Sequence, residues 1–215
     1  VGYVVARVCG LCAIVHSTCY TLACEELLGL EAPRRASYLR IIANELDRIH
    51  SHLLCLAHTA ENAGFEALFM RTMKDRELIM EAQETLTGNR VQFDYVCIGG
   101  VNKDVTTDIE RVVKEKLTLL KQKVAEIEEL FLNNWSLSLK YKGVGTITTE
   151  SALRCSVLGP LARASGVDFD VRNESDYLPY SALGFKSIVE SGGDIHARNM
   201  VRLREVFESI RLIEA

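Results

Sequence analysis

Four of the seven cysteines of this 215-residue chain lie close together near its beginning, at Cys9, Cys12, Cys19 and Cys24. Cys9 and Cys12 are separated by two residues, a spacing that lets two thiolates ligate the same metal. Gly10 between them allows the backbone to turn tightly. The same spacing also occurs in zinc sites, iron–sulfur sites and redox dithiols, so the pair alone predicts one of these chemistries without choosing among them.

Two side chains flanking the pair can adjust its chemistry. Arg7 precedes it, and a guanidinium there is expected to lower the pKa of the thiols and favour thiolate ligands. His16 follows Cys12 by four residues, on the same face of a helix, where it can orient a ligand or accept a hydrogen bond from it. Cys19 shares that face, so a zinc site of Cys12, His16 and Cys19 is an alternative arrangement.

The remaining cysteines are Cys24, Cys55, Cys97 and Cys155, and none has a C-x-x-C partner. We predict that they are core residues, because free cysteine packs as a small hydrophobic side chain. The odd count and the crowding near Cys9 argue against a disulfide framework. We therefore expect reduced thiols in a cytoplasmic setting.

Other polar side chains have two interpretations each. His50 falls on the apolar side of its predicted helix, as a satisfied core histidine or as a proton relay. His52 and His58 face other directions, and Glu61 follows His58 at a distance that suits an exposed helix pair. Arg163, in a Gly/Pro-rich segment, could approach a metal site or partner, or could cap a helix or bind a loop carbonyl.

Composition narrows the class of protein. Hydrophobic residues make up 48% and charged residues 25% of the chain, which predicts an ordered domain. The net charge of −4 and the lack of a basic stripe exclude a nucleic-acid partner. No apolar run reaches the roughly 18–20 residues of a membrane span, and no signal peptide is expected. Because the chain does not begin with Met, we expect that its first residue is a cut.

Long helices must position these side chains. Apolar residues recur at helical spacing with few prolines, and the expected helices are Cys12–Gly29, Pro33–Gly64, Glu66–Leu86, Thr107–Phe131 and Asp194–Ile213. Pro33 is expected in a first turn, and Thr107 with Glu110 in a capping box. The segment Val91–Asn102 is expected to be loop or short strand.

These elements predict a mainly α fold, a long-helix antiparallel bundle. Its buried positions are predicted to include Leu46, Ile49, Leu53, Leu117, Leu120 and Val124. The Lys/Glu run from Lys114 to Glu129 is expected to face solvent or a neighbouring subunit. Gly143–Asp176, rich in Gly and in Val/Ile alternating with Thr, is predicted to be a small irregular segment of loop, a short helix and a ribbon.

The pattern R-x-C-G-x-C-x-x-x-H, from Arg7 to His16, resembles the first cysteine motif of nickel–iron hydrogenase large subunits. Further along, Glu45–Leu54 is similar to a helix shared by energy-converting hydrogenases and the complex I 49 kDa-type subunit. The resemblance continues in order through Phe69–Arg71, Asp75–Glu77, Thr87–Arg90, Ile98–Val101 and Gly159–Asp168. Quinone-linked complex I subunits lack the nickel-binding cysteines, so Cys9 and Cys12 indicate the hydrogenase side of this superfamily. The segments Arg163–Gly166 and Glu45–His52 resemble the membrane-associated, energy-converting group of hydrogenases.

The resemblance implies roles for four residues. Cys9 would be a terminal nickel ligand and Cys12 would bridge nickel to an iron that carries diatomic ligands. Arg7 and His16 would surround these ligands. Family members carry a second motif, Asp-Pro-Cys-x-x-Cys, and a region before the first motif, and neither occurs here. We therefore expect residues 1–215 to be a partial large-subunit domain, inactive alone and without the complete nickel–iron centre.

The resemblance also implies an activity and partners: interconversion of H2 with protons and electrons, with electrons passing to a small subunit that holds an iron–sulfur cluster. Membrane subunits would bind the chain on the cytoplasmic face, and ferredoxin or formate dehydrogenase would be linked indirectly. Two other hypotheses are a metal-free scaffold subunit of a complex I-like membrane oxidoreductase and a generic zinc or redox protein.

Overall fold

A computed structural model describes residues 1–91 and 93–215 of the chain. Its α-helices are α1 (Gly2–Val5), α2 (Ala13–Leu28), α3 (Arg34–Asn62), α4 (Glu66–Thr87), α5 (Thr107–Asn133), α6 (Trp135–Tyr141), α7 (Thr149–Arg154), α8 (Gly159–Arg163), α9 (Val171–Glu174) and α10 (Ile195–Glu214). A 3₁₀ turn, η1, covers Ser181–Leu183, and two strands are β1 (Val96–Cys97) and β2 (Gly100–Val101).

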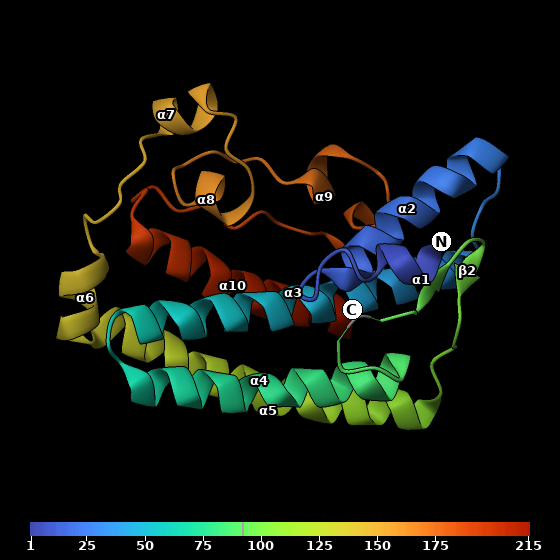
Figure 1. Ribbon diagram of the computed structural model, residues 1–215, viewed down its shortest axis with the longest axis horizontal. Coiled ribbons are helices and arrows are strands. Elements are labelled where there is room, and N and C mark those ends of the chain that lie inside the picture. Colours follow the sequence, from blue (N-terminus) through green and yellow to red (C-terminus); the bar gives the residue numbers. More distant parts are fainter. Residues whose placement is uncertain (92) are drawn as a thin grey trace.

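Four long helices form the bundle that the sequence predicts. In Figure 1, α4 and α5 lie beneath α3 and α10, and each helix packs against two others: α3 on α4 and α10, and α5 on α4 and α10. The predicted core positions Leu46, Ile49, Leu53, Leu117, Leu120 and Val124 are all fully buried. The helix packing of the predicted apolar faces therefore confirms a mainly α bundle.

Glycine ends three of the helices near the bundle ends. Gly29, Gly64 and Gly88 adopt left-handed φ angles of 62°, 74° and 88°, which a side chain would disfavour. The observed ends of α2, α3 and α4 agree with the predicted ones to within two residues. Pro33, expected in the first turn of α3, instead precedes the helix with an extended ψ of 142°.

The start of α5 also differs by one residue from the prediction. The N-cap is Thr106, whose hydroxyl accepts from the backbone N–H of Ile109 at 3.4 Å. Thr107 is already helical, so the capping box that it would form with Glu110 does not occur. Two adjacent threonines can both cap, and Thr106 takes an extended conformation, with ψ of 163°, that suits the role.

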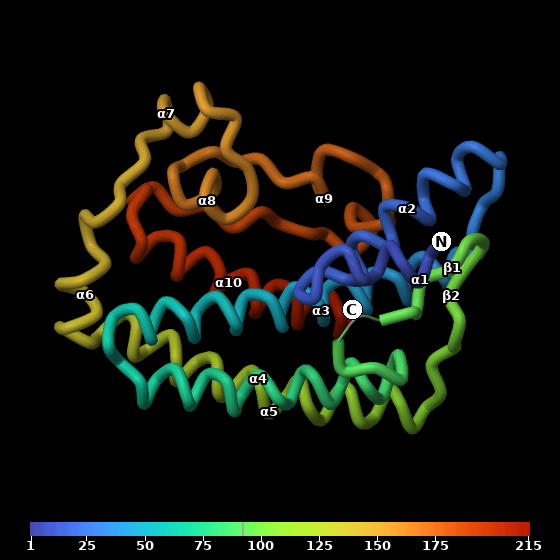
Figure 2. Tube along the Cα trace, in the orientation of Figure 1, coloured from blue at the N-terminus to red at the C-terminus, as the bar shows by residue number. Residues whose placement is uncertain are grey.

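The segment 143–176 is irregular, as predicted, but its composition of elements differs. Three short helices, α7, α8 and α9, occur in it, and no strand forms there, although every residue of that range is described. The ribbon predicted for this segment is therefore wrong. The hairpin of β1 and β2, in which Val96 pairs with Val101, lies in Val91–Asn102, where a loop or short strand was predicted. In Figure 2 the trace from α7 to α9 lies on the side of α10 away from α4 and α5.

Buried ion pairs fasten this segment to the bundle. Glu45 of α3 lies 3.3 Å from Arg172 of α9, and Arg172 lies 2.7 Å from Asp170. Arg163 of α8 contacts Asp170 at 3.1 Å and donates from Nε to Glu205 of α10 at 2.8 Å. All five side chains are almost completely buried. These charges compensate one another and join α3, α8, α9 and α10.

Candidate metal centre

The two cysteines of the motif meet at the beginning of α2. Cys12 is the residue that precedes the helix, and Cys9 lies in the turn before it. The ligand atoms of Cys9, Cys12 and His16 all lie within 4.8 Å of one another, and all three side chains are half-buried. The predicted juxtaposition of Cys12 and His16, one helical turn apart, is therefore confirmed, and Cys9 joins them.

The two thiols differ in acidity. The pKa of Cys9 is lowered, first by a hydrogen bond from the Cys12 thiol and then by the backbone N–H of Leu11, whose nitrogen lies 3.4 Å from Cys9 Sγ. Burial, and then the hydrogen bond to Cys9, raise the pKa of Cys12 to about 12. Cys9 therefore ionises first, and a metal ion must displace the proton of Cys12.

Arg7 makes its contacts elsewhere. Its two terminal nitrogens donate to the Asp94 carboxylate at 2.8 and 3.0 Å, and one also donates to the Tyr3 carbonyl. The lowered pKa of Cys9 comes from Cys12 and Leu11, so the expectation that Arg7 acidifies the thiols is wrong for this structure. Arg7 instead ties the cysteine segment to the loop before β1.

The donor set fits a soft metal. Two thiolates and one imidazole are ligands for zinc, nickel or an iron site, and three donors leave further coordination positions open. Within residues 1–91 and 93–215, this is the one group of three or more His, Cys, Asp or Glu side chains whose ligand atoms come so close together. Cys19 is exposed and does not belong to it, which removes the alternative zinc site of Cys12, His16 and Cys19.

Two buried polar side chains that the sequence analysis did not single out are Asp47, which lies near Cys12, and Arg76, which contacts His50. Asp47 of α3 is 2% exposed, and burial raises its pKa to about 8 despite the charge of Arg48 and the backbone N–H of Ile14. Arg76 of α4 is also buried and donates to Nε2 of His50. The available signal was an acidic residue and an arginine within apolar helix faces.

His50 is fully buried, as expected. Burial, then the charge of Arg76, lower its pKa to about 4, against the backbone of Leu11, which favours protonation. The ring is therefore neutral near pH 7. Its position next to Leu11 brings it close to the cysteines, and its role in moving protons stays a prediction.

The outlying cysteines are not in the core. Cys55 and Cys155 are exposed, and Cys24 and Cys97 are half-buried, so the prediction that they are core residues is wrong. Position 55 lies between Leu53 and Leu56, which are fully buried, on the opposite face of α3. The helical period, applied to the thiol as well as to the leucines, would have placed Cys55 outside.

The other ambiguous residues take structural positions. His52 is buried and contacts Glu205 at 2.6 Å, whereas His58 pairs with Glu61 on the exposed side of α3 at 3.0 Å. Arg163 binds the Phe169 carbonyl at 3.1 Å as well as its acidic partners. The loop-carbonyl interpretation of Arg163 is thus confirmed, and Arg163 is outside the metal cluster.

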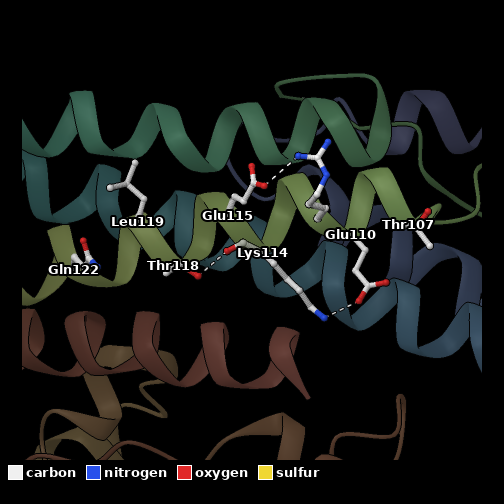
Figure 3. A pocket seen from close by; sticks show the side chains of 8 residues that line it. Thr107, Glu110, Lys114, Glu115, Thr118, Leu119 and Gln122 are labelled. Atoms are coloured by element: carbon white, nitrogen blue, oxygen red, sulfur yellow. Dashed lines mark hydrogen bonds and ion pairs between the residues drawn. The ribbon is translucent and has the colours of Figure 1, made fainter.

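The Lys/Glu run of α5 faces solvent. Figure 3 shows the side chains that line a hollow along this helix, with Lys114 directed at Glu110. Arg111 donates to Glu115 at 3.1 Å on the same helix face. All of the lining residues belong to one helix face, and none is near Cys9. This hollow is a solvated ion-pair surface and supplies no group for metal chemistry.

Two family models match the chain in succession. Residues 1–61 match nickel-dependent hydrogenase, and residues 62–215 match the respiratory-chain NADH dehydrogenase 49 kDa subunit. The change between them falls at the end of α3, so the cysteine pair, His16, Asp47 and His50 all lie in the hydrogenase part. None of the described helices combines the length and apolarity needed to cross a bilayer.

The individual relatives include subunits of a hydrogenase, of an NADH-quinone oxidoreductase and of an F(420)H(2) dehydrogenase. The chain is 40% identical to a subunit of the F(420)H(2) dehydrogenase of Methanosarcina mazei, over 98% of the chain and 56% of the relative. It is 33% identical to the alpha subunit of the membrane-bound hydrogenase of Pyrococcus furiosus, over 99% of the chain and 51% of the relative. It is 36% identical to a subunit of the NADH-quinone oxidoreductase of Sinorhizobium medicae, over 95% of the chain and 50% of the relative. The chain thus spans about half the length of the relatives it matches.

Proposed function

The chain belongs to the family of the respiratory-chain NADH dehydrogenase 49 kDa subunit and nickel-dependent hydrogenase, and on that premise we propose that it is part of the catalytic large subunit of an energy-converting nickel–iron hydrogenase. The observation that carries this proposal is the cluster of Cys9, Cys12 and His16 at the start of α2. A 49 kDa-type subunit without metal has no need of two thiols and an imidazole within 4.8 Å of one another.

In this proposal Cys9 and Cys12 would supply two of the thiolates that hold a nickel–iron centre. The centre, when bound, supplies the cleavage and formation of H2. Cys9 ionises first, and Cys12 gives up its proton on metal binding. His16 would lie beside the ligands as the imidazole of the cluster, whereas Arg7 would act only by anchoring the segment before Cys9 to Asp94.

The partners follow from the same premise. One relative is named a membrane-bound hydrogenase subunit, which supports assembly with membrane subunits, and another is named a subunit of formate hydrogenlyase. We propose the cytoplasmic face of the membrane as the place of this assembly. Electrons would pass to a small subunit with an iron–sulfur cluster, and then to ferredoxin or a formate dehydrogenase. In the described structure no other cysteines gather closely enough to hold such a cluster.

A second candidate is a metal-free scaffold subunit of a complex I-like oxidoreductase. Its specific support is that the 49 kDa model matches the larger part of the chain, residues 62–215, and that several relatives are named as subunits of NADH-quinone oxidoreductase.

Metal content separates the two candidates. The complex that contains this chain would be purified from its source cells, with nickel and iron measured by elemental analysis and H2-dependent dye reduction measured in parallel. We expect both metals and activity in the wild type, and loss of both in Cys9→Ser and Cys12→Ser. Cys155→Ser, an exposed thiol outside the cluster, is the matched control. An assembled, redox-active complex without nickel would decide for the scaffold.

A further inference from the structure

One face of α3 carries a stripe of polar side chains that contact α2. Arg40 donates to Glu25 of α2 at 2.6 and 2.9 Å, and four residues later Asn44 donates to Thr18 at 3.0 Å. Asp47 continues the same face three residues further on. Because the contacts move backwards along α2 as they move forwards along α3, the two helices are antiparallel, and Asp47 falls opposite the first turn of α2.

The first turn of α2 lacks the usual capping groups. The Cys12 side chain makes no capping hydrogen bond, and the first turn contains no acidic residue. The first backbone N–H groups of a helix have no partner within it. The carboxylate of Asp47 is close enough to the N–H of Ile14 for that group to stabilise its anion. Asp47 thus brings from α3 the acceptor that α2 lacks.

His50, one turn after Asp47, is held from the other side by Arg76. A guanidinium only donates hydrogen bonds, so the contact of Arg76 with His50 Nε2 makes that nitrogen the acceptor. The neutral ring must then carry its proton on Nδ1, an assignment that follows from the donor rule. Nδ1 lies 3.9 Å from Asp47 Oδ1, on the side of the Leu11 backbone. Within the described residues this buried nitrogen has no hydrogen-bond partner, so Asp47 is an electrostatic neighbour of the ring.

We propose that Asp47 is a positioning residue that holds the first turn of α2 at Ile14, next to Cys12, and thereby fixes the direction of the Cys12 thiol towards Cys9 and His16. His50, whose Nδ1 lies 3.9 Å from Asp47 and whose ring is held by Arg76, supports Asp47 in this task. The inference rests on the proposed function only for the identity of the metal, because the clamp itself acts in the metal-free chain.

The decisive measurement is hydrogen exchange at the Ile14 amide, together with alkylation of Cys12, in the metal-free 215-residue chain. In Asp47→Ala we expect Ile14 to exchange about tenfold faster, the size of one lost capping bond, and Cys12 to alkylate several-fold faster. Asp47→Asn keeps an oxygen that accepts from Ile14, so both rates should stay within about twofold of wild type.

Helix α3 itself offers the matched control. His58 and Glu61 form a pair with the same three-residue spacing, but their side chains are 56% and 53% exposed. His58→Ala with Glu61→Ala should leave Ile14 exchange and Cys12 alkylation unchanged. If this control changed both rates as Asp47→Ala does, the effect would belong to α3 as a whole, and the clamp would be refuted.

Two further results would overturn the proposal. One is a folded Asp47→Ala chain in which Ile14 is as protected as in the wild type. The other is an Asp47→Asn chain that loses protection as fully as Asp47→Ala, because the acceptor would then have no part in it. Should Asp47→Ala fail to fold, His50→Phe removes the ring that supports Asp47, and unchanged Ile14 exchange and Cys12 alkylation in that variant refute the clamp. Absence of nickel from the native complex would defeat the proposed function and leave these rates as they are.

Discussion

The rate of alkylation should distinguish the Cys12 thiol from an exposed thiol such as Cys155. The thiolate is the reactive form, and Cys12, with a pKa of about 12, is rarely ionised near pH 8. The higher intrinsic nucleophilicity of a basic thiolate recovers only part of this loss. We expect Cys12 to alkylate roughly tenfold or more slowly than the exposed Cys155, as followed by mass spectrometry under native conditions. Equal rates would show that Cys12 is neither shielded nor held protonated.

His50 should make stability depend on pH. Its pKa falls from 6.5 to about 4 on folding, so the folded chain disfavours the protonated ring. The contribution of the neutral His50 ring to the stability of the folded chain is complete above pH 6.5 and is lost as the pH falls towards 4. We expect the wild type to lose about 2 kcal/mol more than His50→Gln between pH 6.5 and 4.5, by urea unfolding. His58→Gln, at an exposed site, should retain the wild-type pH dependence, and a wild-type slope in His50→Gln would contradict the prediction.

For individual side chains, the sequence predicts which ones come together when they are close in the chain and follow a turn or helix spacing. Cys9, Cys12 and His16 come together because a turn and one helical turn bring them there, and the family resemblance gave them a role. Asp47 and Arg76 reach the same place through the packing of α3 against α2 and α4, which no local spacing encodes. The polar stripe of Arg40, Asn44 and Asp47 was a visible signal for this contact.

The start of α5 provides a test at the level of a single element. Thr106→Ala removes the hydroxyl that accepts from Ile109, so we expect a loss of about 1 kcal/mol in the free energy of unfolding. Thr107→Ala is the matched control, since Thr107 is equally exposed and makes no cap, and it should change stability little. A larger effect at Thr107 than at Thr106 would restore the capping box of the sequence prediction.

The long elements were predictable, and the short ones were not. The apolar period of 3.6 over more than 15 residues places α3, α4, α5 and α10 almost to the residue, because one apolar face of each is buried. The buried face of α2 is mainly polar, with Ser17, Thr18, Thr21 and Glu25, and its ends were predicted from Cys12 and Gly29. The segments α7, α8 and α9 are four to six residues long and carry no full period. Their conformation depends on buried contacts with α3 and α10, such as that of Arg172 with Glu45.

The chain contains one C-x-x-C pair, Cys9 and Cys12, and this limits the metal that it can hold. Two thiolates cannot fix both metals of a nickel–iron centre, so the purified 215-residue chain should contain nickel far below one atom per chain and should not oxidise H2. Elemental analysis after purification measures this directly. Near-stoichiometric nickel and iron would mean that other side chains complete the centre.

Glu205 of α10 belongs to the buried ion-pair network that joins the irregular segment to the bundle. Burial opposes ionisation of Glu205, but the hydrogen bond from His52 and the charge of Arg163 outweigh burial, and its pKa is lowered. Glu205→Gln keeps the shape and removes the charge, which leaves Arg163 with Asp170 as its remaining acidic partner. A buried arginine deprived of a partner costs roughly 3 kcal/mol in urea unfolding.

The free energy of unfolding, measured as a function of pH, provides a second test of the role of Glu205. A carboxylate with a lowered pKa stabilises the folded chain above its unfolded pKa of about 4.5 and loses that contribution as the pH falls further. Glu205→Gln should therefore be less stable than the wild type at pH 7, with a difference that shrinks below pH 4.5. Glu115→Gln, in the exposed pair with Arg111, should cost less than about 0.5 kcal/mol. If Glu205→Gln were as mild as Glu115→Gln at pH 7, the buried network would not be what fastens the irregular segment to α10.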